Sequence, residues 1–431
     1  MKAMVRPKRL GAIVAAFMAV WMVVLSLGSN AAHAAGTPGG EWTENSLGLN
    51  VTSAILIAAD TGQVIYEVNA DAPRSPASMT KLMTEYIVLD QIASGKLSWD
   101  TMVTVSKEAA STPADGSQIY LAEGDQHTVK QLYIAMAVGS ANDATVALAD
   151  QIAGTEAKFV DLMNETAQKL GLKTAHYTSA TGLAESTVIS ARDMASLART
   201  ILTTHKEFLD YSTIQSYKFR ERDKQPMINN NWMLASNASI TNFKQYAYPG
   251  VDGMKTGYTS AAGYTFTGTV MRDGVRYISV VMNADSKGSR FTETAKLYDY
   301  VFSNIEKKVA VPAKTVVETT EKIKIKKGKK TTVPVVTDAD VSFYVKKGTE
   351  PKIELSGTTV ATDGQLVAPI QAGQKIGTAT YKYTDDQGKS IEQTVNLVAS
   401  EQVDKASWIR LLFRGIKDFF VDLFDGIVNL F

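Results

Sequence analysis

Two stretches that alternate apolar and polar residues, at opposite ends of a long helical region, place the strongest constraint on the fold. Residues 52–70 alternate around a turn that begins at Asp60, which predicts a β-hairpin. Residues 266–283 alternate around the Asp-Gly pair at Asp273, a strong hairpin signal. Strands at both ends with helices between them favour one antiparallel sheet closed by the two terminal segments. The sequence therefore predicts an α+β fold for residues 40–305.

Helical periodicity fills most of the sequence between the hairpins. Apolar residues recur three and four positions apart, and glycines or polar caps mark the ends of each run. One long run is interrupted by Gly-Ser-Ala-Asn at Gly139. The predicted helices cover residues 78–95, 128–153 in two pieces, 156–170, 190–205 and 291–302, and residues 251–258 form a further strand.

The pattern changes after Lys308, where short alternating runs are separated by glycines. This pattern predicts a small all-β domain over residues 306–400. One of its runs, residues 322–330, carries six lysines. Binding to anionic wall polymers is one interpretation of this run, but a half-exposed strand with a solvated lysine face is the one we favour.

The last segment, residues 401–431, contains a stretch of large apolar residues over 408–431 in which charges fall three or four positions apart. As a helix it has too many charges to span a bilayer and too wide an apolar arc to lie in water. We expect an amphipathic helix that attaches to a membrane surface; burial against the protein or a partner is the alternative. The charges are Arg410, Arg414, Lys417, Asp418, Asp422 and Asp425.

Residues 1–34 have the pattern of a secretory signal. Basic residues precede an apolar run over residues 10–27, and a small-x-small cleavage site ends at Ala34. Since the run is long enough to cross a bilayer, an uncleaved anchor is the alternative. We expect cleavage after Ala34, which gives an exported protein whose first domain covers residues 35–305.

Composition excludes several classes of function. Lysine plus arginine (45) nearly equals aspartate plus glutamate (44), so no overall charge favours nucleic acid. The absence of cysteine rules out disulfides, a cysteine nucleophile and cysteine-based zinc sites. His-Glu-x-x-His, Gly-x-Ser-x-Gly and glycine-rich phosphate-loop patterns are also absent. We therefore expect no metal, no cofactor and no nucleic-acid partner.

A serine and a lysine lie three residues apart at the start of the first predicted helix. Ser78 and Lys81 would share one face of its first turn, where free N–H groups favour a developing oxyanion. A serine hydroxyl needs a base to become a nucleophile, and a lysine with a lowered pKa can be that base. The spacing is common by chance, and Ser78 as a simple helix cap is the alternative.

Three further segments carry polar side chains that suit such a site. One lies on the break between two helices, one lies in a strand with a glycine that allows a ligand to approach, and one opens the last helix. Each has an ordinary explanation by itself, but their order along the predicted fold favours a single site. The residues are Ser140, Asn142, Lys255, Thr256, Gly257 and Arg290.

These motifs resemble those of serine D-alanyl-D-alanine carboxypeptidases, the low-molecular-mass penicillin-binding proteins of the penicillin-binding protein 5 type. The family combines Ser-x-x-Lys, Ser-x-Asn and Lys-Thr-Gly. The match extends through PASMTKLMTEY, GSANDA, DGMKTGYTSAAGYTFTGT and GSRFTET, and includes the β-domain and the terminal helix. Ala141 and Tyr258 depart from some relatives without removing a catalytic side chain. The resemblance implies a serine β-lactamase/transpeptidase-like domain, an antiparallel sheet with helices.

The resemblance also implies a substrate, the peptidoglycan pentapeptide ending in D-Ala-D-Ala, and covalent inhibition by β-lactam antibiotics. Ser78 would be the nucleophile, Lys81 its base and Ser140 a proton relay. The backbone N–H groups of Ser78 and Tyr258 would form the oxyanion hole. The enzyme would act on the outer face of the cytoplasmic membrane. Substrate binding would fall to Asn142, Lys255, Thr256, Gly257, Tyr258 and Arg290.

Two alternatives remain at the level of sequence. A class A β-lactamase needs a Glu-x-x-x-Asn loop between the second and third motifs, and Glu156, Glu165 and Glu185 do not have that spacing. A catalytically inactive wall-binding scaffold would be favoured by the loss of a motif residue, but all of them are present.

Overall fold

A five-stranded antiparallel sheet forms the centre of the first domain in this computed structural model, which describes residues 45–320, 322–361, 365–385, 388 and 390–428. The predicted secretory signal lies outside the described residues. The strand order β2-β1-β9-β8-β7 brings the two ends of the domain together, with Ile55 opposite Val280. The strands are β1 (Ser53–Ala58), β2 (Val64–Val68), β7 (Val251–Thr259), β8 (Gly263–Arg272) and β9 (Val275–Ala284).

This sheet confirms the prediction that hairpins from both ends of the domain join one antiparallel sheet. The turn between β8 and β9 has positive φ at both central residues, 51° at Asp273 and 76° at Gly274. Such turns match the twist of the two flanking strands, and Asp-Gly is one of the few pairs that adopt them readily. The local sequence therefore fixes this hairpin.

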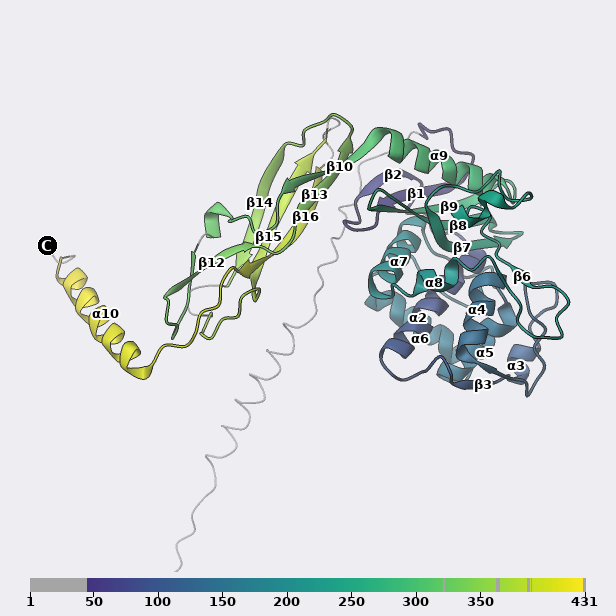
Figure 1. The fold of residues 1–431 in the computed structure, drawn as a ribbon, viewed down its shortest axis with the longest axis horizontal. Coiled ribbons are helices and arrows are strands. Elements are labelled where there is room, and N and C mark those ends of the chain that lie inside the picture. Colours follow the sequence, from purple (N-terminus) through teal and green to yellow (C-terminus); the bar gives the residue numbers. More distant parts are fainter. Residues whose placement is uncertain (1–44, 321, 362–364, 386–387, 389, 429–431) are drawn as a thin grey trace, which may run out of the picture.

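Helices cover both faces of the sheet (Figure 1). Ile55 packs in a core with Met83 and Leu132 of the larger helical layer, whereas its neighbour Leu56 packs in a core with Phe291. Alternate side chains of one strand thus supply two cores. The larger layer contains α2 (Lys81–Ala93), α4 (Val129–Gly139), α5 (Asn142–Ala153), α6 (Glu156–Lys169), α7 (Ala191–Thr204) and α8 (Phe208–Ser212), and α9 (Ser289–Asn304) covers the other face.

Short elements connect these layers. They are η1 (Ala77–Thr80), β3 (Met102–Thr104), α3 (Lys107–Ala110), β4 (Gln126–Thr128), β5 (Ser216–Tyr217), β6 (Met227–Ile228) and η2 (Ala235–Ser239).

An all-β domain follows α9, as predicted, and is called the β-domain below. It contains a two-stranded and a five-stranded antiparallel sheet around a core that includes Val335, Phe343 and Leu397. The pair is β10 (Ile305–Val311) with β13 (Val341–Lys346). The larger sheet has the order β11 (Lys322–Lys324), β12 (Thr332–Thr337), β16 (Ser390–Ala399), β15 (Lys375–Thr384) and β14 (Ile353–Val360), and η3 (Glu318–Thr320) precedes it.

Side-chain-to-backbone hydrogen bonds join the two domains. The Gln63 amide donates to the Tyr344 carbonyl at 2.7 Å and accepts from the Tyr344 N–H at 2.9 Å. The Tyr344 hydroxyl also donates to Asp60 at 2.8 Å. The predicted hairpin turn at Asp60 therefore serves as a docking point for the β-domain.

The last described element is an amphipathic helix, α10 (Trp408–Val428), at the end of the β-domain far from the first domain (Figure 1). The lysine-rich run is only partly the strand that we predicted. It forms β11 over three residues and then follows an irregular path, where Gly328 pairs with Lys405. This pairing places the second half of the lysine run beside the start of α10.

Candidate active site

Ser78 lies on the 3₁₀ turn η1, which leads directly into α2. The predicted helix start near Ser78 is confirmed, although its first turn is tighter than an α-helix. Ala77, just before it, has a φ of 48°, a left-handed conformation that is uncommon outside glycine. The first N–H groups of a helix have no acceptor within that helix, and Ser78 is the second residue of η1. The Ser78 N–H is therefore free to donate to a bound ligand.

Lys81 is fully buried, and its Nζ contacts three oxygens. It lies 3.1 Å from Ser78 Oγ, 2.6 Å from Asn142 Oδ1 and 2.9 Å from the Thr181 carbonyl. Burial, and secondly the positive charge of Lys255, holds the pKa of Lys81 well below its usual range. A neutral amine has two N–H bonds and one lone pair, which match two carbonyl acceptors and one hydroxyl donor. The geometry thus suits a neutral Lys81 that accepts the Ser78 proton.

Ser140 and Asn142 lie where α4 ends and α5 begins. Ser140 has a φ of 57° and closes α4 in the left-handed conformation, and the chain re-enters a helix at Asn142. The break that interrupts the helical pattern therefore turns both side chains towards α2 and β7. The neighbouring Asp143 fixes this corner, because its carboxylate accepts the backbone N–H groups of Ile119 and Leu121 at 3.0–3.1 Å.

Lys255 enters the site from β7, the edge strand of the sheet. Its side chain is 3% exposed, and Nζ donates to Ser140 Oγ at 2.9 Å and to the Thr256 carbonyl at 3.2 Å. Burial lowers the pKa of Lys255 to about 8, although the Glu85 charge raises it. Ser78 and Ser140 are therefore each paired with a different buried lysine.

Gly257 allows β7 to approach the nucleophile closely. A Cβ at this position would lie 2.6 Å from the Pro76 carbonyl and 3.0 Å from Ser78 N, so any side chain would push the strand away. Tyr258 follows and is half-exposed, with its ring stacked on Tyr264 at 4.4 Å. The Lys-Thr-Gly motif thus packs its backbone against η1.

Arg290 lies behind β7. Its guanidinium is 2% exposed and donates to the Gly257 carbonyl at 3.1 Å. Burial lowers the pKa of Arg290 to about 10. The structure therefore places this residue against the backbone of the Lys-Thr-Gly strand, where sequence analysis expected it to support substrate charge.

Two residues of the cluster escaped sequence analysis. Glu85 is one turn after Lys81 on α2 and is 1% exposed; its Oε1 has no hydrogen-bond partner in the described structure. Burial raises the pKa of Glu85 to about 7, against the charges of Lys255 and Lys81. A glutamate within an apolar helical run, four residues from the lysine, was the available signal. Thr181 is the second such residue, because its backbone carbonyl accepts a hydrogen bond from Lys81. No sequence pattern predicts a backbone acceptor of this kind.

Family profiles match most of the described chain. Residues 41–286 match a profile described as D-alanyl-D-alanine carboxypeptidase, and residues 306–405 match the C-terminal domain of penicillin-binding protein 5. The first match ends at residue 286, before α9 begins, and the second begins at residue 306, at the start of the β-domain.

Curated proteins and solved structures give the same result. The chain is 35% identical to D-alanyl-D-alanine carboxypeptidase DacF of Bacillus subtilis, covering 85% of this chain and 89% of DacF. It is 33% identical to DacC of Escherichia coli, with 85% and 88% covered. Penicillin-binding protein 5 of Haemophilus influenzae superposes with a TM-score of 0.67 at 31% identity, covering 83% of this chain and 98% of that one. Penicillin-binding protein D2 of Listeria monocytogenes, in its cefotaxime-bound form, gives a TM-score of 0.52 at 32% identity, with 59% and 98% covered.

Proposed function

This chain belongs to the D-alanyl-D-alanine carboxypeptidase family, and from that premise we propose how Ser78 and its neighbours remove the last D-alanine of a peptidoglycan pentapeptide. The chain is a serine carboxypeptidase and a low-molecular-mass penicillin-binding protein, which β-lactams acylate. The contact between Ser78 Oγ and the buried Nζ of Lys81, at 3.1 Å, carries the assignment of roles.

In the proposed first step, Ser78 Oγ attacks the carbonyl carbon of the penultimate D-alanine while its proton passes to Lys81 Nζ. The negative charge that develops on the carbonyl oxygen is held by the backbone N–H groups of Ser78 and Tyr258. One such donor is worth about 3–4 kcal/mol of transition-state stabilisation. The close packing of β7 on η1 at Gly257 supports this pairing of donors.

In the second step, the C–N bond breaks and the amine of the terminal D-alanine takes the proton that Lys81 had accepted, relayed by Ser140. This leaves an ester on Ser78 and returns Lys81 to its neutral form. Water then hydrolyses that ester and restores the serine. We assign Ser140 this role because its hydroxyl accepts a hydrogen bond from Lys255 at 2.9 Å. Asn142 would hold the substrate amide as well as orient Lys81.

Lys255 and Thr256 would bind the terminal carboxylate of the substrate, with Lys255 in its charged form. Arg290 would support carboxylate binding from behind the strand, because it donates a hydrogen bond to the Gly257 carbonyl and so fixes the backbone of β7. We assign Glu85 a supporting charge, because its carboxylate raises the pKa of Lys255 and so helps that lysine to stay charged. Glu85 also raises the pKa of Lys81, but burial and the charge of Lys255 outweigh it there.

A pH profile of kcat/KM tests the assignment of Glu85. The Lys255 pKa of about 8 predicts an alkaline limb where this lysine loses its proton. Above pH 7 Glu85 is mostly ionised, since its pKa is about 7, and it favours the protonated lysine. Glu85→Gln removes that charge, so the alkaline limb is expected to move to lower pH. Glu123→Gln, at an exposed position, is the control and is expected to leave the limb in place; an unmoved limb in Glu85→Gln contradicts the assignment.

Release of free D-alanine is the direct test of the activity. A chain starting at residue 35 is expected to release one D-alanine from a pentapeptide ending in D-Ala-D-Ala, and none from the same peptide ending in D-Ala-L-Ala. A folded chain that labels with penicillin but releases no D-alanine at any pH would contradict the carboxypeptidase role. Such a result would favour the scaffold alternative.

Slow turnover of penicillin is expected, because Glu156, Glu165 and Glu185 lack the Glu-x-x-x-Asn spacing with which class A β-lactamases activate the deacylating water. In the structure, Glu156 uses its Oε1 to accept the Ala180 N–H at 2.8 Å. Rapid penicillin hydrolysis would revive the β-lactamase alternative.

We also propose that the enzyme works outside the cytoplasm, on the outer face of the cytoplasmic membrane, and that α10 attaches it there. Leu412, Phe413, Phe419 and Phe420 are each more than half exposed on α10, which favours burial of this surface in a lipid interface. Within the described residues, every helix is too short or too polar to cross a membrane. Residues 1–34 would be removed on export, 35–305 would carry out the chemistry, 306–400 would hold it away from the membrane, and 401–431 would provide the attachment.

Truncation tests the attachment. A chain ending at Ala406 keeps the pairing of Gly328 with Lys405 and the hydrogen bond from Ala406 N to the Lys327 carbonyl, so the β-domain stays closed. We expect this chain to move from the membrane pellet to the soluble fraction with unchanged penicillin labelling. If it sediments with membranes as firmly as the longer chain, the proposed anchor is wrong.

A further inference from the structure

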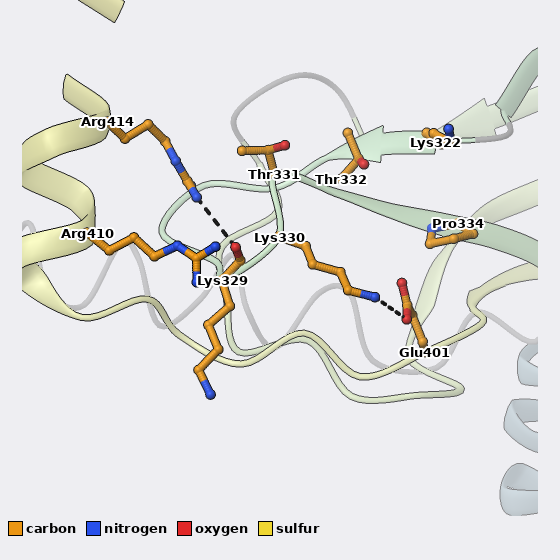
Figure 2. A pocket seen from close by; sticks show the side chains of 9 residues that line it. All are labelled: Lys322, Lys329, Lys330, Thr331, Thr332, Pro334, Glu401, Arg410 and Arg414. Atoms are coloured by element: carbon orange, nitrogen blue, oxygen red, sulfur yellow. Dashed lines mark hydrogen bonds and ion pairs between the residues drawn. The ribbon is translucent and has the colours of Figure 1, made fainter. Parts of the chain in front are cut away.

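A basic pocket of about 440 Å³ lies where α10 meets the β-domain (Figure 2). Five basic side chains and one acidic side chain line it. Three of the basic residues belong to the β-domain and two to α10, so the pocket exists only because the lysine run folds against the helix. The charged lining residues are Lys322, Lys329, Lys330, Arg410, Arg414 and Glu401.

The charges in this pocket are only partly neutralised. Lys330 pairs with Glu401 at 2.5 Å, and Lys329 pairs with Asp404 at 2.9 Å. Arg414 donates to the Gly328 carbonyl at 3.1 Å, a contact that docks α10 without cancelling its charge.

In the described part of the chain, Lys322 and Arg410 also form no ion pair. The pocket therefore keeps an excess of positive charge, and an anion with several acceptor oxygens would complete it. Phosphate oxygens suit both guanidinium and ammonium donors.

The position of the pocket on α10 indicates where that anion comes from. Arg410 and Arg414 are four residues apart and lie on the polar stripe of the helix, whereas the large apolar side chains are exposed elsewhere on it. A helix of this kind lies with its apolar face at the boundary between headgroups and acyl chains. Its polar stripe, and with it the pocket, then lies at the level of the lipid phosphates.

We propose that this pocket binds the phosphodiester of an anionic lipid headgroup. The β-domain and α10 would then both be attached to the membrane surface. The inference rests on the proposed attachment of α10 to a membrane. It gives the lysine run a ligand, where the sequence favoured only a solvated face, and it fixes the angle of the β-domain to the membrane through two separate elements.

Vesicle binding tests the proposal with the chain that starts at residue 35. The probes are vesicles of phosphatidylcholine with and without phosphatidylglycerol. Lys322→Gln combined with Lys330→Gln is expected to weaken binding to the anionic vesicles about 25-fold, about fivefold for each charge removed. Binding to pure phosphatidylcholine is expected to remain, because the apolar face of α10 is unchanged. Penicillin labelling and the melting temperature report that both domains stay folded.

A matched control removes two lysines from the opposite end of the β-domain. Lys352→Gln combined with Lys382→Gln changes the net charge equally, near the end where Lys347 N donates to Asn304 of α9. These charges lie far from the proposed lipid surface and are screened, so a loss of no more than about twofold is expected. If both double variants lost vesicle binding equally, the attraction would depend on net charge alone, and the proposed lipid site in the pocket would be wrong.

Two other outcomes would also overturn the lipid assignment. Saturable binding of inorganic phosphate without vesicles, lost in the pocket variant, would assign the pocket to a soluble phosphate. Binding of poly(glycerol phosphate) that the pocket variant loses, with vesicle binding unchanged, would assign it to a wall polymer. Failure of the anchor is distinguished separately, because then the chain ending at Ala406 would bind vesicles as well as the longer chain does.

Discussion

Replacement of Ser78 by alanine is expected to abolish covalent labelling by penicillin and release of D-alanine. Both reactions pass through an ester on the same oxygen, so removing that oxygen removes the covalent step entirely. Labelling with a fluorescent penicillin, followed by denaturing electrophoresis and mass measurement of the chain, would show the effect. We expect no adduct even after long incubation at high penicillin concentration.

The fold of this variant is expected to survive, because Ser78 is only half-buried and its hydroxyl forms one contact, to Lys81. Thermal unfolding of the variant checks this. Ser94→Ala, at the end of the same helix where the hydroxyl contacts only the Gln91 carbonyl, is the matched control and should label normally. A penicillin adduct on a chain that lacks Ser78 would refute the assignment of the nucleophile.

Replacement of Lys81 is expected to slow acylation by about 10²–10⁴-fold, the usual contribution of a general base. Lys81→Arg is the sharper variant, since a guanidinium keeps its charge and cannot accept the serine proton. Lys81→Met keeps most of the volume but supplies no base. Both variants are expected to acylate at similarly low rates in a stopped-flow assay, and neither rate should rise with pH in the way expected for the unchanged chain.

The controls separate chemistry from folding. In Lys81→Met, the buried Asn142 Oδ1 and Thr181 carbonyl lose their donor, at a cost of about 1–3 kcal/mol each. Removal of a buried amine offsets part of that cost. Lys96→Met, at an exposed site just beyond α2, is the control and should change neither the acylation rate nor the stability of the fold. Near-normal acylation by Lys81→Arg would show that another group is the base.

The elements of the fold follow closely from local sequence. The turns at Asp60 and Asp273, the helix break at Gly139 and the helix start at Ser190 lie where the sequence predicts them. These features depend on interactions between near neighbours, such as left-handed φ at Asp-Gly or a side chain capping its own helix. The order of strands in the sheet depended on a weaker argument, that hairpins at both ends of the domain would meet, and the structure confirms it.

The candidate site was predicted residue by residue but not contact by contact. The sequence motifs predicted both serines and both lysines as site residues. The pairing of Ser140 with Lys255, however, depends on how α4 packs against β7. Arg290 was predicted to support the charge of the substrate, and in the structure its guanidinium donates to the Gly257 carbonyl of β7, a contact that the sequence did not indicate. Glu85 was overlooked because a single glutamate in a helix is usually solvent-exposed, and only packing shows that this one is buried.

The sequence by itself determined that this chain carries an acylation motif on an α+β domain, followed by a β-domain and an amphipathic helix. Those features are periodicities and short motifs, which local geometry enforces. Only the tertiary structure decided the chemical state of Lys81, because its pKa depends on complete burial and on the charge of Lys255 from a distant strand. The same holds for the basic pocket, which forms where two segments far apart in sequence bring like charges together. The electrostatic environment of a group depends on its distances to all the surrounding charges, and the order of residues along the chain does not give those distances.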